Sequence, residues 1–198
     1  MGAIFQSLGR TISAGVVLLV IFVILAGLGT GSWIRAGDHA WWAFFMRWLH
    51  VLSGVMWIGL LWYFNFVQTP SMPKIPDEQK PAVSKVIAPT ALFWFRWGAM
   101  ATIVTGLILA WMNGYMVQAL SLQKGYHAIG LGIWLGAIMW FNVWFIIWPN
   151  QKKALGIVQV APEEKAKAAK VAGMTSRINT MLSIPMLYCM VAQQNGGL

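Results

Sequence analysis

Long apolar stretches constrain this chain more than any other feature of its sequence. Four of them reach the ~20 residues that a helix needs to cross a ~30 Å hydrocarbon core. Their approximate bounds are 12–34, 41–69, 89–116 and 126–148. A fifth stretch, 178–194, is shorter and contains Pro185, but no charge follows Arg177, so we interpret it as a further span. Alternating strands are absent, and runs this long do not build a barrel. The sequence therefore predicts an all-α polytopic membrane protein.

Composition supports the same class. Charged residues make up 10% of the chain and hydrophobic residues 59%, whereas soluble domains are about a quarter charged. The one cysteine, Cys189, lies in the last apolar stretch, so we expect it to be a packing residue. A C-x-x-C-H motif for covalent haem attachment is absent. All five acidic residues fall in loops, which disfavours proton pumping through buried carboxylates.

The lysines and arginines are distributed unequally between the two predicted faces of the membrane. With five spans, the N-terminus and the loops 70–88 and 149–177 share one face, and this face carries all but three of the 14 lysines and arginines. The three on the opposite face are Arg35, Arg47 and Lys124. Because such an excess marks the cytoplasmic side, we expect a bacterial inner (cytoplasmic) membrane protein with its N-terminus inside and its C-terminus outside. Topology and attraction to anionic lipid explain the charge, so the predicted partner is the lipid bilayer and not nucleic acid.

An internal repeat organises the chain. Residues 50–66, HVLSGVMWIGLLWYFNF, match residues 127–143, HAIGLGIWLGAIMWFNV, in outline. The repeat predicts an N-terminal transmembrane anchor helix in 1–40 and a four-helix membrane bundle in 41–198, built from helix pairs at about 41–116 and 126–194. Because the second and fourth helices both run from outside to inside, the two pairs are expected to be parallel repeats about an axis along the membrane normal.

Each copy of the repeat carries a histidine with similar neighbours. On a helix, positions i, i+3, i+4 and i+7 share one face. Around the first histidine, His50, this face contains Arg47, Gly54 and Trp57. Around the second, His127, the corresponding residues are Lys124, Gly130 and Trp134. Measured from the proline that ends each stretch, the two histidines differ in height by about 3 Å at ~1.5 Å per residue.

Two histidines at one height predict a bis-histidine site for haem b, with His50 and His127 as the metal ligands. Arg47 and Lys124 would pair with the haem propionates, and the glycines and tryptophans would form the cofactor-binding walls. The alternative is that each histidine only hydrogen-bonds to a neighbouring helix, and that shared ancestry of the two halves preserves the match. A mononuclear zinc or copper site is disfavoured, because two histidines are too few ligands.

Two further features have structural interpretations. Asn65 and Asn142, the second repeated polar pair, are expected to hydrogen-bond across helices. The polar stretch APEEKAKAAKVAG in the loop 149–177 is expected to form a short surface helix beginning at Pro162.

Four sequence blocks taken together carry a resemblance to a known family. They are RWLHVLSGVMWIG (47–59), WFRWGAMATIVTG (94–106), LGAIMWFNVWFIIWPNQKK (135–153) and SRINTMLSIPML (176–187). These blocks resemble the membrane domain of bacterial membrane-bound urate hydroxylases, the urate oxidase N-terminal family. The resemblance implies a helical redox domain, which in full-length members precedes a cytochrome c domain that accepts the electrons. Only His50 matches that pattern residue by residue. This chain contains no cytochrome c domain, so the resemblance implies that a c-type cytochrome is a separate chain.

Two functions remain open at this point. The first is an integral membrane redox protein that binds haem b and passes electrons to a separate cytochrome. The second is a non-catalytic accessory subunit of a larger, respiratory-type membrane complex. Whether the protein is an enzyme stays open, and no catalytic residue is assigned. A channel or transporter is disfavoured, because the spans lack a polar stripe.

Overall fold

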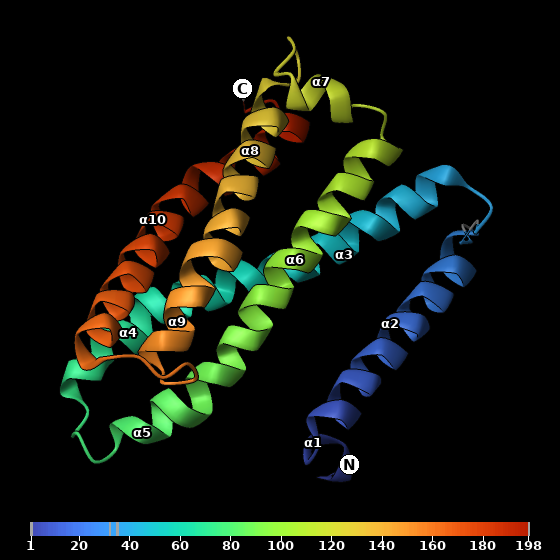
Figure 1. Cartoon of the computed structure of the whole chain (residues 1–198). Coiled ribbons are helices and arrows are strands. Elements are labelled where there is room, and N and C mark those ends of the chain that lie inside the picture. The colour runs from blue at the N-terminus through green and yellow to red at the C-terminus, as the bar shows by residue number, and fades with distance from the viewer. Residues whose placement is uncertain (1, 32, 35, 198) are drawn as a thin grey trace. The chain divides into compact units, whose positions relative to one another are not determined.

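A computed structural model describes residues 2–31, 33–34 and 36–197 (Figure 1). Arg35, one of the predicted outer cations, lies outside these residues. Every regular element in the described part of the chain is helical, which confirms the all-α class. The chain divides into two compact units, residues 1–42 and 43–198, and each is described by itself.

The first unit is dominated by one apolar helix. α1 (Gly2–Phe5) leads into α2 (Leu8–Thr30). Within α2 only Gly27 is buried, and most of the helix consists of aliphatic residues. The helix ends at Gly31, whose φ of 69° lies in the left-handed region and whose N–H donates to the Gly27 carbonyl. A helix that is apolar all round suits a lipid environment.

The second unit contains four long helical segments, three of which include a π-helical turn. The first segment consists of α3 (His39–Trp62), which begins in the first unit, then η1 (Tyr63–Gln68), α4 (Thr69–Ser71) and η2 (Met72–Lys74). The second consists of α5 (Lys80–Ala82), η3 (Val83–Ile87) and α6 (Ala88–Met112). The short α7 (Met116–Leu120) precedes the third, which consists of α8 (His127–Phe141), η4 (Asn142–Ile147) and α9 (Trp148–Ala154). The fourth is α10 (Pro162–Asn195).

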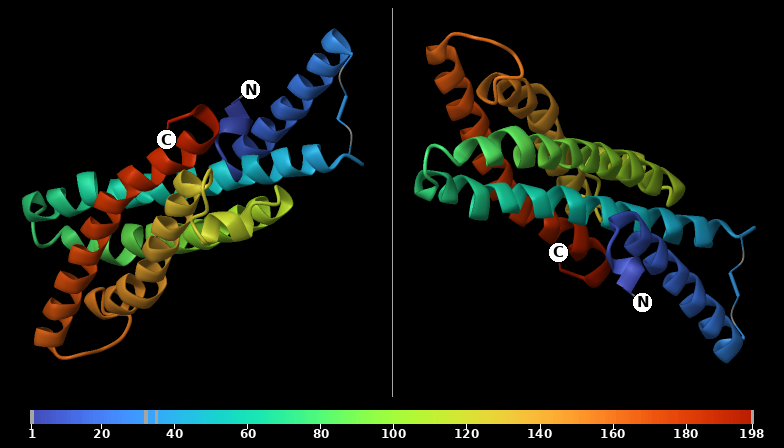
Figure 2. Two further views of the ribbon diagram at one scale, coloured as in Figure 1. Left: turned by 90° about the horizontal axis from the view of Figure 1, so that it is seen from above. Right: turned by 90° about the horizontal axis from the view of Figure 1, so that it is seen from below.

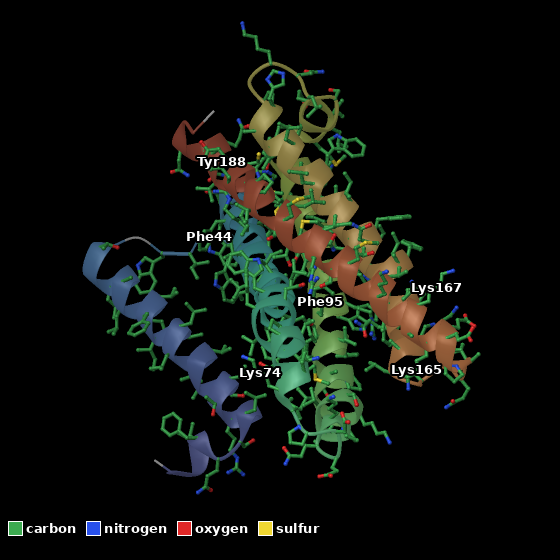
Figure 3. The ribbon with its side chains drawn as sticks, turned by 90° about the vertical axis from the view of Figure 1, so that its left-hand side faces the viewer. Phe44, Lys74, Phe95, Lys165, Lys167 and Tyr188 are labelled. Atoms are coloured by element: carbon green, nitrogen blue, oxygen red, sulfur yellow. The ribbon has the colours of Figure 1, made fainter. Side chains whose placement is uncertain are left out.

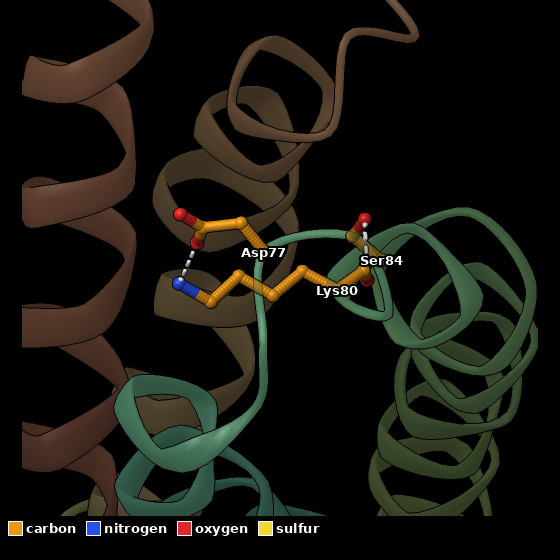
Figure 4. A network of polar contacts seen from close by, with 3 residues as sticks. All are labelled: Asp77, Lys80 and Ser84. Carbon is orange, nitrogen blue, oxygen red and sulfur yellow. Dashed lines mark hydrogen bonds and ion pairs between the residues drawn. The ribbon is translucent and has the colours of Figure 1, made fainter.

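The turn between the first two segments is closed by a small polar network (Figure 4). Lys80 Nζ donates to Asp77 Oδ1, and Ser84 Oγ donates to the Lys80 carbonyl at 3.1 Å. The hydrogen bond and the charge of Lys80 lower the pKa of the exposed Asp77 carboxyl. This carboxylate therefore stays ionised at neutral pH, and the contact is lost only as the pH falls through that lowered pKa.

Four helical segments of the described chain are long and apolar enough to cross a membrane. They are Leu8–Thr30, His39–Lys74, Lys80–Met112 and His127–Ala154. This finding supports a multi-pass membrane protein and matches four of the five predicted spans. The fifth, 178–194, lies inside α10, which is not among the four because polar residues are interspersed along it. The five-span topology and the orientation of the termini stay predictions.

The last helix, α10, is longer than the sequence predicts. The sequence predicts a short surface helix that begins at Pro162 and is separate from the last apolar stretch. Pro162 does begin a helix, but α10 continues without a break to Asn195, a length of 34 residues. α10 packs beside α8 and α9. The prediction of a separate surface helix is therefore wrong. The alanine- and lysine-rich stretch has high helix propensity, so the helix continues through it into the last apolar stretch.

All four long segments of the second unit contribute to one buried core. It includes Trp57 and Leu61 from α3, Phe95 from α6, Met139 from α8 and Met186 from α10. α3 and α6 run side by side (Figure 2). They approach closely where Gly98 meets α3, because a Cβ at this glycine would lie 3.3 Å from the Trp57 backbone nitrogen.

Buried polar side chains on α10 connect it to the other helices. Asn142 Nδ2 donates to Asn179 Oδ1 at 2.8 Å, and Asn179 Nδ2 donates to the Met139 carbonyl at 2.9 Å. Asn65 Nδ2 donates to Ser176 Oγ at 2.8 Å. These bonds confirm the expectation that Asn65 and Asn142 hydrogen-bond across helices. They also reveal a polar face on α10 that the sequence analysis did not predict.

Asn179 is fully buried, so we expect its replacement by leucine to destabilise the protein by about 1–3 kcal/mol. The physical reason is that Asn142 Nδ2 would lose its partner in the core. The measurement is the midpoint of thermal unfolding in detergent. Asn195→Leu is the control, because Asn195 is exposed and donates to the Val191 carbonyl of its own helix. Equal midpoints for the two variants would contradict the prediction.

Candidate functional site

A cavity of about 700 Å³ lies between α3, α6, α8 and α10. Most of its wall is aliphatic and includes Val51, Val55, Leu107 and Ile133. Five of the residues predicted from the sequence also line it: Arg47, His50, Gly54, Trp57 and Trp134. A mostly apolar cavity of this size with a few polar groups is typical of a site for a small molecule or cofactor.

His50 is held in a defined orientation by α6. Its Nδ1 lies 2.9 Å from the Thr102 carbonyl oxygen and 3.3 Å from Thr105 Oγ1. Because a carbonyl oxygen can only accept, we assign the proton to Nδ1 and the lone pair to Nε2. Nε2 has no hydrogen-bond partner in the described part of the chain. A histidine that binds a metal commonly donates its other ring N–H to a backbone carbonyl in this way.

Gly106 provides the space for the imidazole. A Cβ at this position would lie 2.8 Å from His50 Cε1 and 3.1 Å from Nδ1. Any side chain larger than hydrogen would therefore push the ring away from the Thr102 carbonyl. The orientation of His50 thus depends on a glycine in the neighbouring helix.

Arg47 and Tyr115 supply polar groups on the same cavity wall. Arg47 Nε is buried and has no hydrogen-bond partner among the described residues. Burial raises the pKa of the Tyr115 phenol, and the nearby charge of Arg47 opposes part of this rise. Tyr115 therefore stays protonated at neutral pH and can donate a hydrogen bond. Its ring stacks on Tyr126, with 6.0 Å between the ring centroids.

Three predicted site residues lie away from the cavity. His127 is exposed at the first position of α8, and Lys124 is exposed in the loop before it. Gly130 is buried against α7, because a Cβ there would lie 2.2 Å from the Ala119 carbonyl oxygen. His50, by contrast, lies well inside α3. The two copies of the motif thus differ in surroundings, and the sharing of one haem by both histidines stays a prediction that this arrangement does not support.

A second, smaller pocket of about 130 Å³ lies among the three π-helical turns. Phe64, Asn65 and Gln68 from η1, Ser84 from η3 and Ile147 from η4 line it. Gln68 Oε1 is buried without a hydrogen-bond partner in the described chain. Nothing in the sequence marks this pocket except the repeated Phe-Asn pair, since residue propensities do not reveal a π-helical turn.

Comparison with known proteins gives one match. The model of the family described as "Urate oxidase N-terminal" matches residues 111–196, which contain α7, α8, η4, α9 and α10. No curated protein and no solved structure matches the chain. The match includes the last two of the four sequence blocks that carry the resemblance, and it confirms that resemblance at the level of the family. The match over residues 111–196 supports the urate oxidase N-terminal family for this part of the chain.

Proposed function

We propose that this protein is an integral membrane redox protein that holds one haem b at His50 and passes electrons to a separate c-type cytochrome. The observation that carries the proposal is the His50 imidazole. Its Nδ1 proton is directed at the Thr102 carbonyl, and its Nε2 is without a partner among the described residues, on the wall of a large apolar cavity. This arrangement leaves Nε2 available as an iron ligand.

The residues present fit a haem held by one histidine of this chain, and not by two. His50 lines the cavity and His127 does not. Arg47 Nε, buried and without a partner in the described chain, suits a propionate carboxylate, since charge-assisted bonds to carboxylates are the strong ones. Trp57 and Trp134 form part of the wall, and aliphatic side chains surround them. A bound haem supplies one-electron redox chemistry, and its potential depends on the axial ligand and on burial.

The absorbance spectrum of the full chain, purified in detergent from cells supplied with a haem precursor, tests the proposal. We expect a Soret band and one haem per chain by the pyridine haemochrome assay. We also expect the reduced haem to be reoxidised on addition of an oxidised c-type cytochrome. A protein that purifies folded and without haem would overturn the proposal and favour the accessory-subunit function.

Gly106→Ala is expected to weaken haem binding by about 10-fold or more, because the added methyl group displaces the His50 ring from its carbonyl partner. Haem titration of the apoprotein gives the affinity. Gly59→Ala is the matched control, since Gly59 also lines the cavity but a Cβ there has no neighbour within 4 Å among the described residues. Similar affinities for the two variants would show that the orientation of His50 does not govern binding.

A further inference from the structure

A cluster of unpartnered donors lies on α6 and the α8–α9 segment, outside the cavity. The Arg96 guanidinium carbon lies 3.3 Å from the centroid of the Trp148 ring, so the two groups are stacked. Arg96 Nη1 is buried and has no hydrogen-bond partner among the residues that the structure describes. Trp144, one turn before Trp148, has a buried Nε1 that is also without a partner there. Arg96 and Trp144 therefore each leave one buried N–H donor unsatisfied, which is costly in a folded protein.

The cluster carries positive charge without a carboxylate to balance it in the described chain. Lys152 Nζ lies 5.7 Å from the centroid of the same Trp148 ring, so two cations share one indole. The two ion pairs found in the described part of the chain are Lys80–Asp77 and Lys153–Glu164. Neither of them includes Arg96 or Lys152. Among the described residues, the positive charge of the cluster is therefore left without an ion pair.

The position of the cluster indicates where this anion comes from. Trp148 lies near the end of the apolar segment His127–Ala154, and Lys152 follows one turn later. Trp97 packs edge-on against Trp144, with 5.5 Å between the ring centroids, and Trp97 itself is half exposed. Tryptophans gather at the level of the lipid headgroups. The tryptophans around the cluster and its place near the end of the segment His127–Ala154 are typical of a site for a lipid headgroup.

We propose that Arg96, Trp144 and Lys152 form a binding site for the phosphate group of an anionic phospholipid. Arg96 Nη1 and Trp144 Nε1 donate to the phosphate oxygens, and Lys152 adds a second positive charge. A planar guanidinium that is already stacked on an indole is well suited to phosphate. The exposed apolar side chains Phe93 and Trp97 offer a surface for the acyl chains. Basic pockets between transmembrane helices are known to bind lipid headgroups in this way.

Native mass spectrometry and thermal unfolding of the delipidated full chain test this site. Added phosphatidylglycerol is expected to bind and to raise the unfolding midpoint, while phosphatidylcholine is not. Arg96→Gln is expected to weaken phosphatidylglycerol binding roughly fivefold. Lys167→Gln is the matched control, because Lys167 is an exposed cation on α10 (Figure 3) and the variant changes the charge equally.

Several outcomes would overturn the lipid site. One is equal lipid binding by Arg96→Gln and Lys167→Gln. Another is an equal stabilisation by inorganic phosphate, which would indicate a site for a free anion. Should Arg96→Gln fail to fold, Lys152→Gln and Trp144→Phe take its place. The first keeps the Arg96–Trp148 stack, and the second keeps an aromatic ring while removing only the N–H donor. Undiminished phosphatidylglycerol binding by both of these variants would also reject the site.

Discussion

Replacing His50 with alanine is expected to abolish haem binding, whereas replacing His127 with alanine leaves the haem content unchanged. The reason is their position: His50 lines the large cavity with its Nε2 available, and His127 lies at the start of α8, away from the cavity wall. The measurement is the Soret absorbance per chain, with haem quantified by the pyridine haemochrome assay. The two variants remove the same side chain from equivalent positions of the repeat, so each is the control for the other.

Imidazole rescue separates the loss of a ligand from the loss of the fold. His50→Ala leaves a space beside Gly106, and added imidazole is expected to enter it and to restore part of the Soret band. His50→Leu fills that space, so imidazole is expected to have no effect. Loss of the Soret band in His127→Ala would instead favour the prediction that both histidines bind the haem. An undiminished band in His50→Ala would remove His50 as the ligand.

Replacing Gly130 with alanine is expected to lower the stability of the fold by about 1–3 kcal/mol, as overpacking of a tight contact does. A Cβ at Gly130 would lie 2.2 Å from the Ala119 carbonyl oxygen and 2.7 Å from Leu122 Cδ2. The first neighbour is backbone, so the clash is relieved only if α7 moves away from α8. The turn after α7 is already constrained, because Leu122 has a φ of 51°.

The midpoint of thermal unfolding measures this effect. Gly173→Ala in α10 is the matched control, since a Cβ at Gly173 would have no neighbour within 4 Å among the described residues. Alanine is favoured over glycine in a helix by about 1 kcal/mol, so this variant is expected to be as stable as the parent or more stable. A Gly130→Ala protein that unfolds at the parent's midpoint would show that α7 does not pack on α8 as described.

The sequence predicts the long apolar segments well, because a membrane span requires a length and a hydropathy that can be read from the residues alone. It predicts α10 less well. The first half of α10 has the composition of a surface helix, and the second half contains Pro185 and several polar residues. Two polar residues near the middle of α10, Ser176 and Asn179, bond to asparagines of the neighbouring segments. Only the packed structure reveals these partners.

The sequence likewise predicts some features of the candidate site and not others. Helical periodicity groups Arg47, Gly54 and Trp57 with His50, and all four line the cavity because α3 is a continuous helix through them. The same periodicity places Lys124 with His127, but the helix begins only at His127, so the rule does not apply before it. The partners that orient His50 lie in α6, 52 residues further along for Thr102. No local pattern predicts such contacts.

The π-helical turns determine where this chain can change its length. Asn65 and Asn142, which occupy equivalent places in the repeat, both lie in such turns. A π-helical turn holds more residues than an α-helical one, so losing a residue there leaves a regular helix, and the residues on either side keep nearly the same orientation. In the first segment, Phe64, Asn65 and Gln68 of η1 line the small pocket, and His50 comes before η1. Single-residue deletions in η1 are therefore expected to reshape the small pocket while the histidine keeps its place.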